Sequence, residues 1–155
     1  MLHHPERLAG VYPRLAACVA RAAEICKLDI IVLEGVRTAE RQAQLYAQGR
    51  TAPGEIVTWV TVSNHEPKAD GFGHAVDLGA LEPDGSVDWQ TTGDYDTIKA
   101  AMFAAAAAMS PPLCLRWGAD WNMNGVPREH GETDQDHFET HGDDRPPVAA
   151  QAVAA

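Results

Sequence analysis

Two histidines and one aspartate, far apart along the chain, are the residues of this sequence best suited to metal chemistry. They stand in three short motifs: Ser63-Asn64-His65, Gly73-His74-Ala75-Val76-Asp77 and Asp134-Gln135-Asp136-His137-Phe138-Glu139. His65 and His137 supply two imidazoles and Asp77 one carboxylate, which is the ligand count of a catalytic zinc ion whose fourth tetrahedral position is left to water. Asp134, three residues before His137, is a candidate base for that water. Spacing alone leaves open that these are ordinary polar surface residues, because the loop between His65 and Asp77 is unusually long.

The alternation of side chains along a strand separates candidate ligands from their neighbours. If residues 74–78 form a strand, Asp77 and His74 point to opposite faces, so Asp77 is the better ligand. His74 is then expected to lie around the ligands or at the surface. The same alternation places His137 with Glu139 and sends Phe138 to the core. The remaining histidines are expected to be solvated or incidental: His3, His4, His130 and His141.

These motifs need a scaffold, and the pattern of apolar residues predicts helices and short strands. Helices are expected over Pro5–Lys27, where Pro13 allows two segments, over Ala39–Gln48 with Thr38 as N-cap, and over Asp94–Met109 before Pro111-Pro112. Strands are expected at Leu28–Leu33, His74–Leu78, Leu113–Trp117 and His137–Thr140, with an extended stretch at Ile56–Val62. This mixture favours an α+β fold: a small, mostly antiparallel sheet flanked by helices, with the zinc site on the sheet and its loops.

Length and charge narrow the class of protein. The 155 residues are expected to form one domain over residues 1–141, followed by a mobile tail over residues 142–155. Lys plus Arg number 12 and Asp plus Glu 22, and the net charge of −10 argues against nucleic acid as a partner. We expect no membrane insertion and no signal peptide, since neither pattern is visible. The three cysteines are expected to be reduced thiols.

The motifs resemble the S-x-H, G-x-A-x-D and D/E-x-x-H-F signatures of zinc D-Ala-D-Ala and L-alanyl-D-glutamate peptidoglycan peptidases. Two further stretches are similar to the phage endolysin branch of that family: Glu34-Gly35-Val36-Arg37-Thr38 and the residues following it to Thr51, and Leu115-Arg116-Trp117-Gly118-Ala119-Asp120-Trp121. The likeness runs from Leu33 to Glu139, most of the chain, with its motifs in the family's order. It implies a Hedgehog/DD-peptidase-like fold.

The resemblance also implies a role for each matching residue. His65, Asp77 and His137 are implied as zinc ligands. Asp134 is implied as the catalytic carboxylate, and Arg37 as the arginine near the substrate and the developing oxyanion. Contacts around the ligands or to substrate are assigned to three further residues: Ser63, His74 and Glu139.

The sequence departs from the family pattern between the first two ligands. Eleven residues separate His65 from Asp77, more than in the family's commonest form, and we interpret residues 66–70 as an insertion. Strict spacing would put Asp70 in the place of the first histidine. We choose His65, because Ser63 stands two residues before it and a loop insertion costs little. Two tryptophans are expected to line the cleft and one to lie in the core: Trp89 and Trp121, and Trp117 respectively.

The function that the resemblance implies is zinc-dependent hydrolysis of the peptidoglycan stem peptide, at the L-alanyl-D-glutamate bond. We expect a monomeric, bacteriolytic phage or prophage endolysin, made in the host cytoplasm and released to the cell wall by a holin. One alternative is a D-Ala-D-Ala carboxypeptidase or dipeptidase that uses the same metal. Another is a non-catalytic, zinc-containing wall-binding module, which would require a fourth protein ligand such as His74 or His130.

Overall fold

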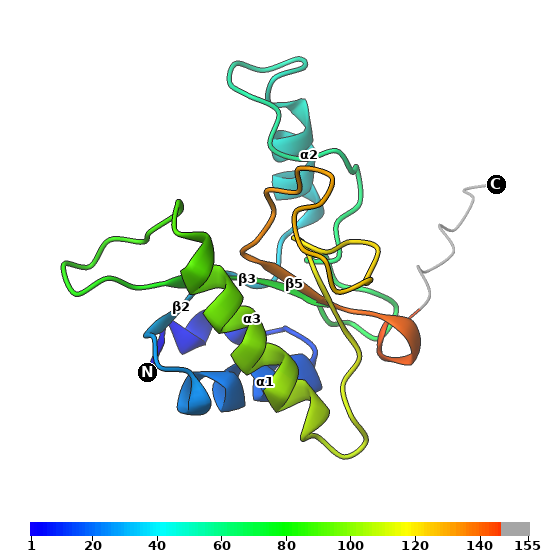
Figure 1. Ribbon diagram of the computed structural model, residues 1–155. Coiled ribbons are helices and arrows are strands. Elements are labelled where there is room, and N and C mark those ends of the chain that lie inside the picture. Colours follow the sequence, from blue (N-terminus) through cyan, green and yellow to red (C-terminus); the bar gives the residue numbers. More distant parts are fainter. Residues whose placement is uncertain (147–155) are drawn as a thin grey trace.

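A five-stranded sheet forms the centre of the protein, as the computed structural model shows for residues 1–146 (Figure 1). The strands lie in the order β1-β2-β3-β5-β4. Their bounds are β1 Leu2–His3, β2 Ile30–Glu34, β3 Ala75–Ala80, β4 Leu115–Trp117 and β5 His137–Thr140. The three α-helices of the described chain are α1 Pro13–Ile25, α2 Ala39–Ala47 and α3 Thr92–Ala107. The described chain also contains two short 3-10 helices, η1 Pro5–Leu8 and η2 Gly142–Asp144.

The α+β class is confirmed, with one correction to the sheet. Strands β2, β3, β5 and β4 pair antiparallel, but β1 pairs parallel to β2, so the sheet is mixed and not mostly antiparallel. The sequence pattern gave no sign of β1, because a two-residue strand has no periodicity to detect. Its position is held by the chain's N-terminus, whose ammonium group forms an ion pair with Asp29 at 2.9 Å.

Helices α1 and α3 pack against each other and against the sheet to form the core. Their buried side chains are mostly alanine, leucine, valine and isoleucine, which lets the two helices approach closely. Phe138 is fully buried, as the strand alternation predicts, and its ring stacks on that of Trp117 at 6.2 Å between centroids. The expected core position of Trp117 is confirmed.

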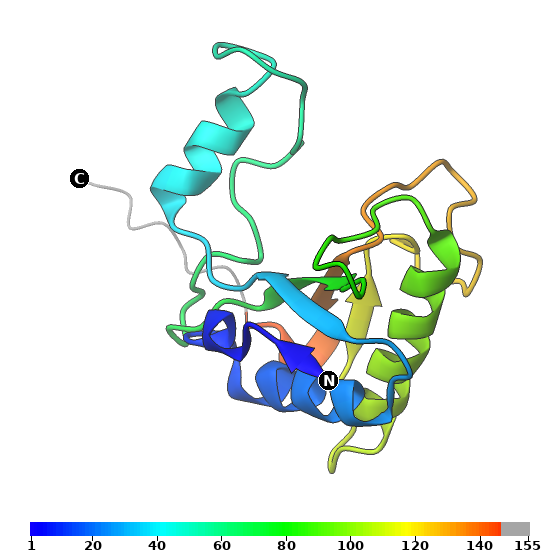
Figure 2. The same cartoon turned by 90° about the vertical axis from the view of Figure 1, so that its left-hand side faces the viewer.

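Helix α2 stands away from this core together with the loop that follows it, and we call residues 39–62 the arm (Figure 2). Thr38 caps α2 as predicted, its side chain accepting a hydrogen bond from the backbone N–H of Arg41 at 3.1 Å. The stretch Ile56–Val62 forms no strand; it runs back to the sheet as a loop with most of its side chains exposed. The arm therefore rises beside the end of the sheet that carries the candidate ligands.

The chain beyond β5 continues against the body of the protein as far as it is described. Asp144 in η2 accepts a hydrogen bond from Arg14 at 2.7 Å and another from the backbone N–H of Cys114 at 2.9 Å. The rest of the tail expected over residues 142–155, residues 147–155, lies outside the described residues. Among residues 1–146, none of the helices is both long and apolar enough to cross a membrane.

Candidate metal centre and cleft

The sheet places the central carboxylate and one histidine directly opposite each other. Asp77 on β3 pairs with His137 on β5 and with Glu34 on β2, so the three side chains lie in one row across the sheet. His65 comes from the loop before β3. The backbone N–H of His74 donates to the carbonyl of Asn64 at 2.7 Å, which holds this loop beside the start of the strand. A Cβ atom at Gly73 would lie 2.7 Å from the carbonyl oxygen of His65, so the close approach requires glycine.

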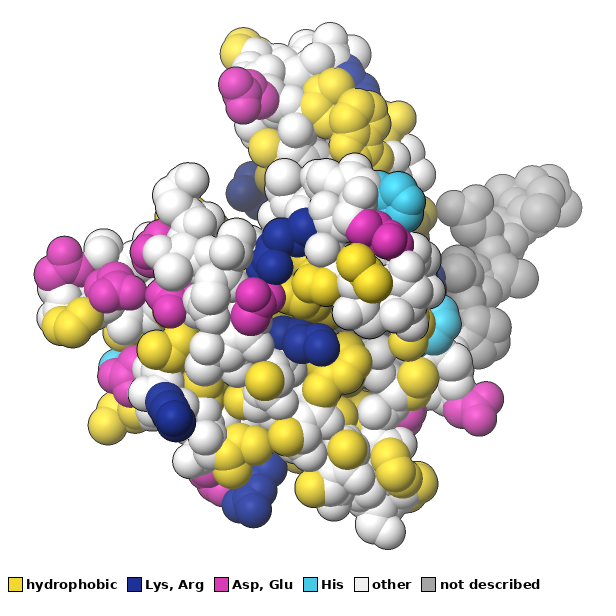
Figure 3. Space-filling view, in the orientation of Figure 1, with side chains coloured by type: hydrophobic (Ala, Val, Ile, Leu, Met, Phe, Trp, Pro, Cys, Tyr) yellow, Lys and Arg dark blue, Asp and Glu magenta, His cyan; other side chains and the backbone are white. Residues whose placement is uncertain are grey.

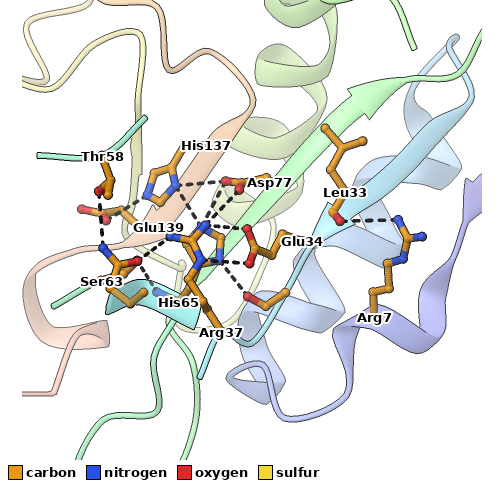
Figure 4. Close-up of polar contacts among 12 residues, drawn as sticks. Arg7, Leu33, Glu34, Arg37, Thr58, Ser63, His65, Asp77, His137 and Glu139 are labelled. Atoms are coloured by element: carbon orange, nitrogen blue, oxygen red, sulfur yellow. Dashed lines mark hydrogen bonds and ion pairs between the residues drawn. The ribbon is translucent and has the colours of Figure 1, made fainter. Parts of the chain in front are cut away.

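Three donor atoms meet at this row and form a nearly equilateral triangle (Figure 4). His65 Nε2 lies 3.1 Å from Asp77 Oδ1 and 3.2 Å from His137 Nδ1, and His137 Nδ1 lies 3.1 Å from Asp77 Oδ1. Atoms bound tetrahedrally to zinc at about 2.0–2.1 Å lie about 3.3 Å apart. The spacing of the donors therefore fits a tetrahedral metal ion.

The hydrogen bonds of the outer ring nitrogens fix the tautomers of His65 and His137. His65 Nδ1 lies 2.7 Å from the carbonyl oxygen of Gly35, and His137 Nε2 lies 3.1 Å from the carboxylate of Glu139. Both oxygens only accept, so the outer nitrogens carry the protons, and in the neutral rings the inner nitrogens present lone pairs. Two lone pairs and a carboxylate oxygen within 3.2 Å of one another require a cation between them.

The pKa shifts of Asp77 and His137 also indicate that positive charge is favoured between the donor atoms. Burial raises the pKa of Asp77, but hydrogen bonds from His137 and His65 outweigh it and hold this pKa well below its usual range. Burial lowers the pKa of His137, but its hydrogen bonds to Asp77 and Glu139 prevail and raise it to about 10. In the metal-free protein a proton on His137 thus supplies the charge that a metal ion would supply.

Glu139 fixes the outer side of His137. Besides His137, its carboxylate accepts hydrogen bonds from Asn64 and from Arg116 Nε, the latter at 2.8 Å. Burial raises the pKa of Glu139, but the His137 and Asn64 hydrogen bonds lower it to about 2. Glu139 therefore stays ionised beside the ring of His137.

Two further carboxylates lie in the same cleft, Asp134 and Asp136. Desolvation in the cleft and the nearby charge of Asp77 raise the pKa of Asp134 despite the opposing histidines. The same causes, with Asp134 added, raise the pKa of Asp136 to about 7. Gly118, directly after β4, admits the Asp134 turn, since a Cβ atom there would lie 2.1 Å from the carbonyl oxygen of Asp134. Asp136 stands directly before His137 in the sequence, but no pattern there predicts a role for it.

Arg37 reaches the site from the segment between β2 and α2. Its Nε donates to Glu34 at 2.8 Å, and its Nη2 lies 3.8 Å from Asp77 Oδ2. Its Nη1 donates to the side-chain oxygen of Gln42 at 2.8 Å, and Gln42 is fully buried. The Gln42 amide in turn donates to the carbonyl of Val60 at 2.6 Å, so it joins the arginine to the arm. A glutamine within a helical pattern carried no signal of this contact.

The insertion predicted at residues 66–70 folds back onto the segment that holds His65. Glu66 accepts a hydrogen bond from the backbone N–H of Ser63 at 2.7 Å, and Lys68 Nζ donates to the carbonyl of Ser63 at 2.6 Å. The Ser63 hydroxyl accepts a hydrogen bond from the N–H of His65 at 3.2 Å. The insertion therefore braces the first histidine, and Asp70 is not part of the donor triangle.

His74 lies apart from the donor triangle. It is fully buried, stacked on Tyr12 at 4.6 Å, with Nε2 2.8 Å from Asp70 and Nδ1 2.8 Å from the hydroxyl of Thr140. A surface position for His74 is therefore wrong. Its ring links the insertion to β5, a structural role that no local pattern could show.

The donor triangle lies in an open cleft of about 940 Å³. One wall is the arm, and the other contains Trp121, whose ring lies 5.5 Å from that of His137. The expectation that Trp121 lines the cleft is confirmed, whereas the same expectation for Trp89 is wrong. Trp89 is exposed in the turn-rich segment before α3 and is not among the residues that line the cleft.

Comparisons with known proteins agree with this geometry. The family model "Phage L-alanyl-D-glutamate peptidase" matches residues 3–141. The chain is 28% identical over 117 residues to "Peptidoglycan L-alanyl-D-glutamate endopeptidase CwlK" of Bacillus subtilis (strain 168), covering 76% of this chain and 68% of that protein. It is 30% identical over 120 residues to the "L-alanyl-D-glutamate peptidase" of Escherichia phage T5, covering 77% of this chain and 79% of the phage protein.

A solved structure has the same fold. The Serratia marcescens L-Ala D-Glu endopeptidase ChiX superposes with a TM-score of 0.66 at 27% identity, over 88% of this chain and 84% of that one. The family match spans all three ligand motifs and the arm. The phage T5 protein and ChiX are both named as peptidases of the L-alanyl-D-glutamate bond. The chain therefore belongs to the phage L-alanyl-D-glutamate peptidase family.

Proposed function

We propose that this protein is a zinc-dependent endopeptidase that cleaves the L-alanyl-D-glutamate bond of the peptidoglycan stem peptide. The observation that carries the proposal is the triangle of donor atoms from His65, Asp77 and His137, open to a cleft that also holds Asp134. Two imidazoles and one carboxylate are a ligand set of catalytic zinc in hydrolases. Family membership and the names of the relatives support the choice of bond.

In this proposal His65, Asp77 and His137 hold the ion. Zinc, when bound, supplies Lewis acidity toward the scissile carbonyl and lowers the pKa of a coordinated water to about 7. The hydrogen bonds from His65 to Gly35 and from His137 to Glu139 keep both rings in the tautomer that presents a lone pair to the ion.

Asp134 acts as the general base and then as the acid. Its raised pKa makes its carboxylate a better proton acceptor than a solvated aspartate, and it returns the proton to the leaving amine of D-glutamate. Arg37, held by Glu34 and Gln42, directs its charge toward the developing oxyanion. Removing a donor of this kind typically costs about 10²–10³-fold in kcat.

The wall-binding alternative predicts a fourth protein ligand, and its two candidates lie elsewhere. His74 contacts Asp70 and Thr140, and His130 is largely exposed beside Glu129 and Glu132. Among residues 1–146, neither belongs to the donor group that contains His65. A cleft that exposes the donor triangle and also contains Asp134 favours catalysis over a closed structural site.

We also propose that the protein works as a monomeric endolysin, made in the host cytoplasm and released to the wall by a holin. The phage description of the family and the phage T5 relative support this setting.

Digestion of purified sacculi tests the proposal. Mass spectrometry of the released material should find a new amino-terminal D-glutamate and a new carboxy-terminal L-alanine, and chelation of the metal should prevent both. Release of terminal D-alanine instead would favour the D-Ala-D-Ala carboxypeptidase alternative. If the zinc-loaded protein leaves the sacculi uncleaved, only the non-catalytic wall-binding alternative would remain.

A further inference from the structure

The arm presents an apolar wall to the cleft that the chemistry at the metal centre does not use. Residues 56–62, Ile-Val-Thr-Trp-Val-Thr-Val, carry no charge, and six of the seven line the cleft. Trp59 is 79% exposed, the largest of several exposed apolar side chains in this stretch. Figure 3 shows hydrophobic side chains gathered on the arm above the body of the protein. A contiguous exposed patch of this kind, continuous with an active-site cleft, marks a binding surface.

The wall is held in place before any ligand binds. Arg50 lies over the rings of Tyr46 at 4.0 Å and Trp59 at 5.4 Å, and it donates to the carbonyl of Thr58 at 3.1 Å. The side-chain amide of Gln42 donates a hydrogen bond to the carbonyl of Val60, two residues after Thr58. The backbone on both sides of Trp59 is thus anchored, which reduces the entropy lost when a ligand contacts the ring.

The chemistry of peptidoglycan decides what lies against this wall. The L-alanine of the stem is joined to the lactyl group of a muramic acid, so two residue-length units, the alanine and the lactyl group, separate the scissile carbonyl from the sugar ring. At about 3.6 Å per residue, the sugar lies roughly 7 Å from that carbonyl, and a cleft that accepts the intact polymer must accommodate it.

The distribution of charge orients the substrate. On the sugar side of the scissile bond the substrate offers a methyl group, the lactyl group and the apolar face of a pyranose ring. Its carboxylates begin with D-glutamate, on the other side. The uncharged stretch of residues 56–62 matches the first part, whereas charged groups line the cleft elsewhere, among them Arg41, Arg116 and Glu132.

We propose that residues 56–62 form a subsite for the muramyl sugar, with Trp59 stacked on the pyranose ring. This inference rests on the proposed function and adds the glycan to the substrate that the enzyme recognises. The subsite would make the enzyme prefer stem peptides still attached to the glycan strand over free peptides.

The test compares two substrates, a disaccharide-tetrapeptide and the same tetrapeptide without sugar. The measured quantity is kcat/KM for the substrate with sugar divided by kcat/KM for the substrate without sugar. Trp59→Ala should lower this ratio about tenfold, the size of effect typical of an aromatic contact residue. Trp59→Phe should restore most of the ratio. The matched control is Trp89→Ala, which removes a tryptophan that is 53% exposed but lies outside the cleft lining and should leave both values unchanged.

The outcomes separate the two proposals. If the wild-type protein cleaves neither substrate, the proposed function fails and the subsite falls with it. The wild type could instead cleave both substrates while Trp59→Ala lowers the two kcat/KM values equally or leaves both unchanged. That result would refute the sugar subsite and leave the proposed function standing. A change of oligomeric state in Trp59→Ala on size-exclusion chromatography, without a change in the ratio, would identify the wall as a self-association face and also refute the subsite.

Discussion

Glu139 accepts a hydrogen bond from the outer nitrogen of His137, two residues earlier on the same strand, at 3.1 Å. The inner nitrogen of that ring lies 3.1 Å from Asp77. The imidazole is therefore held between two carboxylates, one beside the proposed ion and one behind it. The alternation of a single strand sets this arrangement, because residues two apart share a face.

Replacing Glu139 by glutamine should weaken zinc binding about 10–100-fold, since the charge that orients and polarises His137 is lost. Competition with a zinc-chelating dye measures the affinity. Glu24→Gln, at an exposed surface pair with Arg21, is the control and should bind zinc as the wild type does. Equal affinities for all three proteins would show that Glu139 does not act on the ligand.

Metal content should depend on the three residues of the donor triangle. The purified protein is expected to hold about one zinc ion per chain, and His65→Ala and Asp77→Asn should each lose most of it. His130→Ala changes an exposed histidine outside the triangle and should retain the metal. Elemental analysis by mass spectrometry measures the content. Stoichiometric zinc in His65→Ala would exclude the proposed ligand set.

Asp134→Asn should keep zinc but lower kcat on sacculi by about 10²–10⁴-fold, because the amide cannot take the proton. Asp136, whose pKa is raised to about 7, is the neighbouring carboxylate with which to compare it. Asp136→Asn should retain most of the activity. The reverse result, with Asp136→Asn inactive and Asp134→Asn active, would move the base to Asp136.

The stability of the metal-free protein should fall on the alkaline side. The pKa of His137 rises from 6.5 in the unfolded chain to about 10 in the folded one, so its contribution is full below pH 6.5 and is lost as pH rises toward 10. The lowered pKa of Glu139 acts in the opposite direction: its contribution is present above pH 4.5 and is lost as pH falls through about 2.

Urea unfolding between pH 6 and 10, with and without zinc, measures the alkaline loss. Zinc should reduce it, because the ion replaces the proton as the positive charge between the donors. A metal-free protein with the same free energy of unfolding at pH 6 and pH 10 would contradict the expected coupling.

Gln42→Leu should destabilise the protein by about 1–3 kcal/mol, since it leaves the largely buried Arg37 without one of its acceptors and the Val60 carbonyl without its side-chain donor. Gln44→Leu, at an exposed position two residues away on α2, is the matched control and should change stability little. Urea denaturation compares the two. Similar losses in both would show that the Gln42 bridge adds nothing.

The ligand motifs could be predicted from the sequence because they resemble the signatures of a known family, and strand geometry then indicated how their neighbours face. Strand alternation sent Phe138 to the core and put Glu139 on the side of His137, and the structure has both arrangements. The Thr38 cap and the α+β class followed from equally local patterns. Choosing His65 over Asp70 required the serine two residues earlier, and the structure places His65 in the donor triangle.

Tertiary structure alone decided how distant segments support that triangle. The parallel strand β1, the Gln42 bridge between Arg37 and the arm, and the contacts of residues 66–70 with Ser63 join segments whose residue types carry no pairing signal. A buried glutamine or an inserted lysine looks like a solvated residue until the chain folds. The burial that forces such groups to find partners exists only in the folded protein.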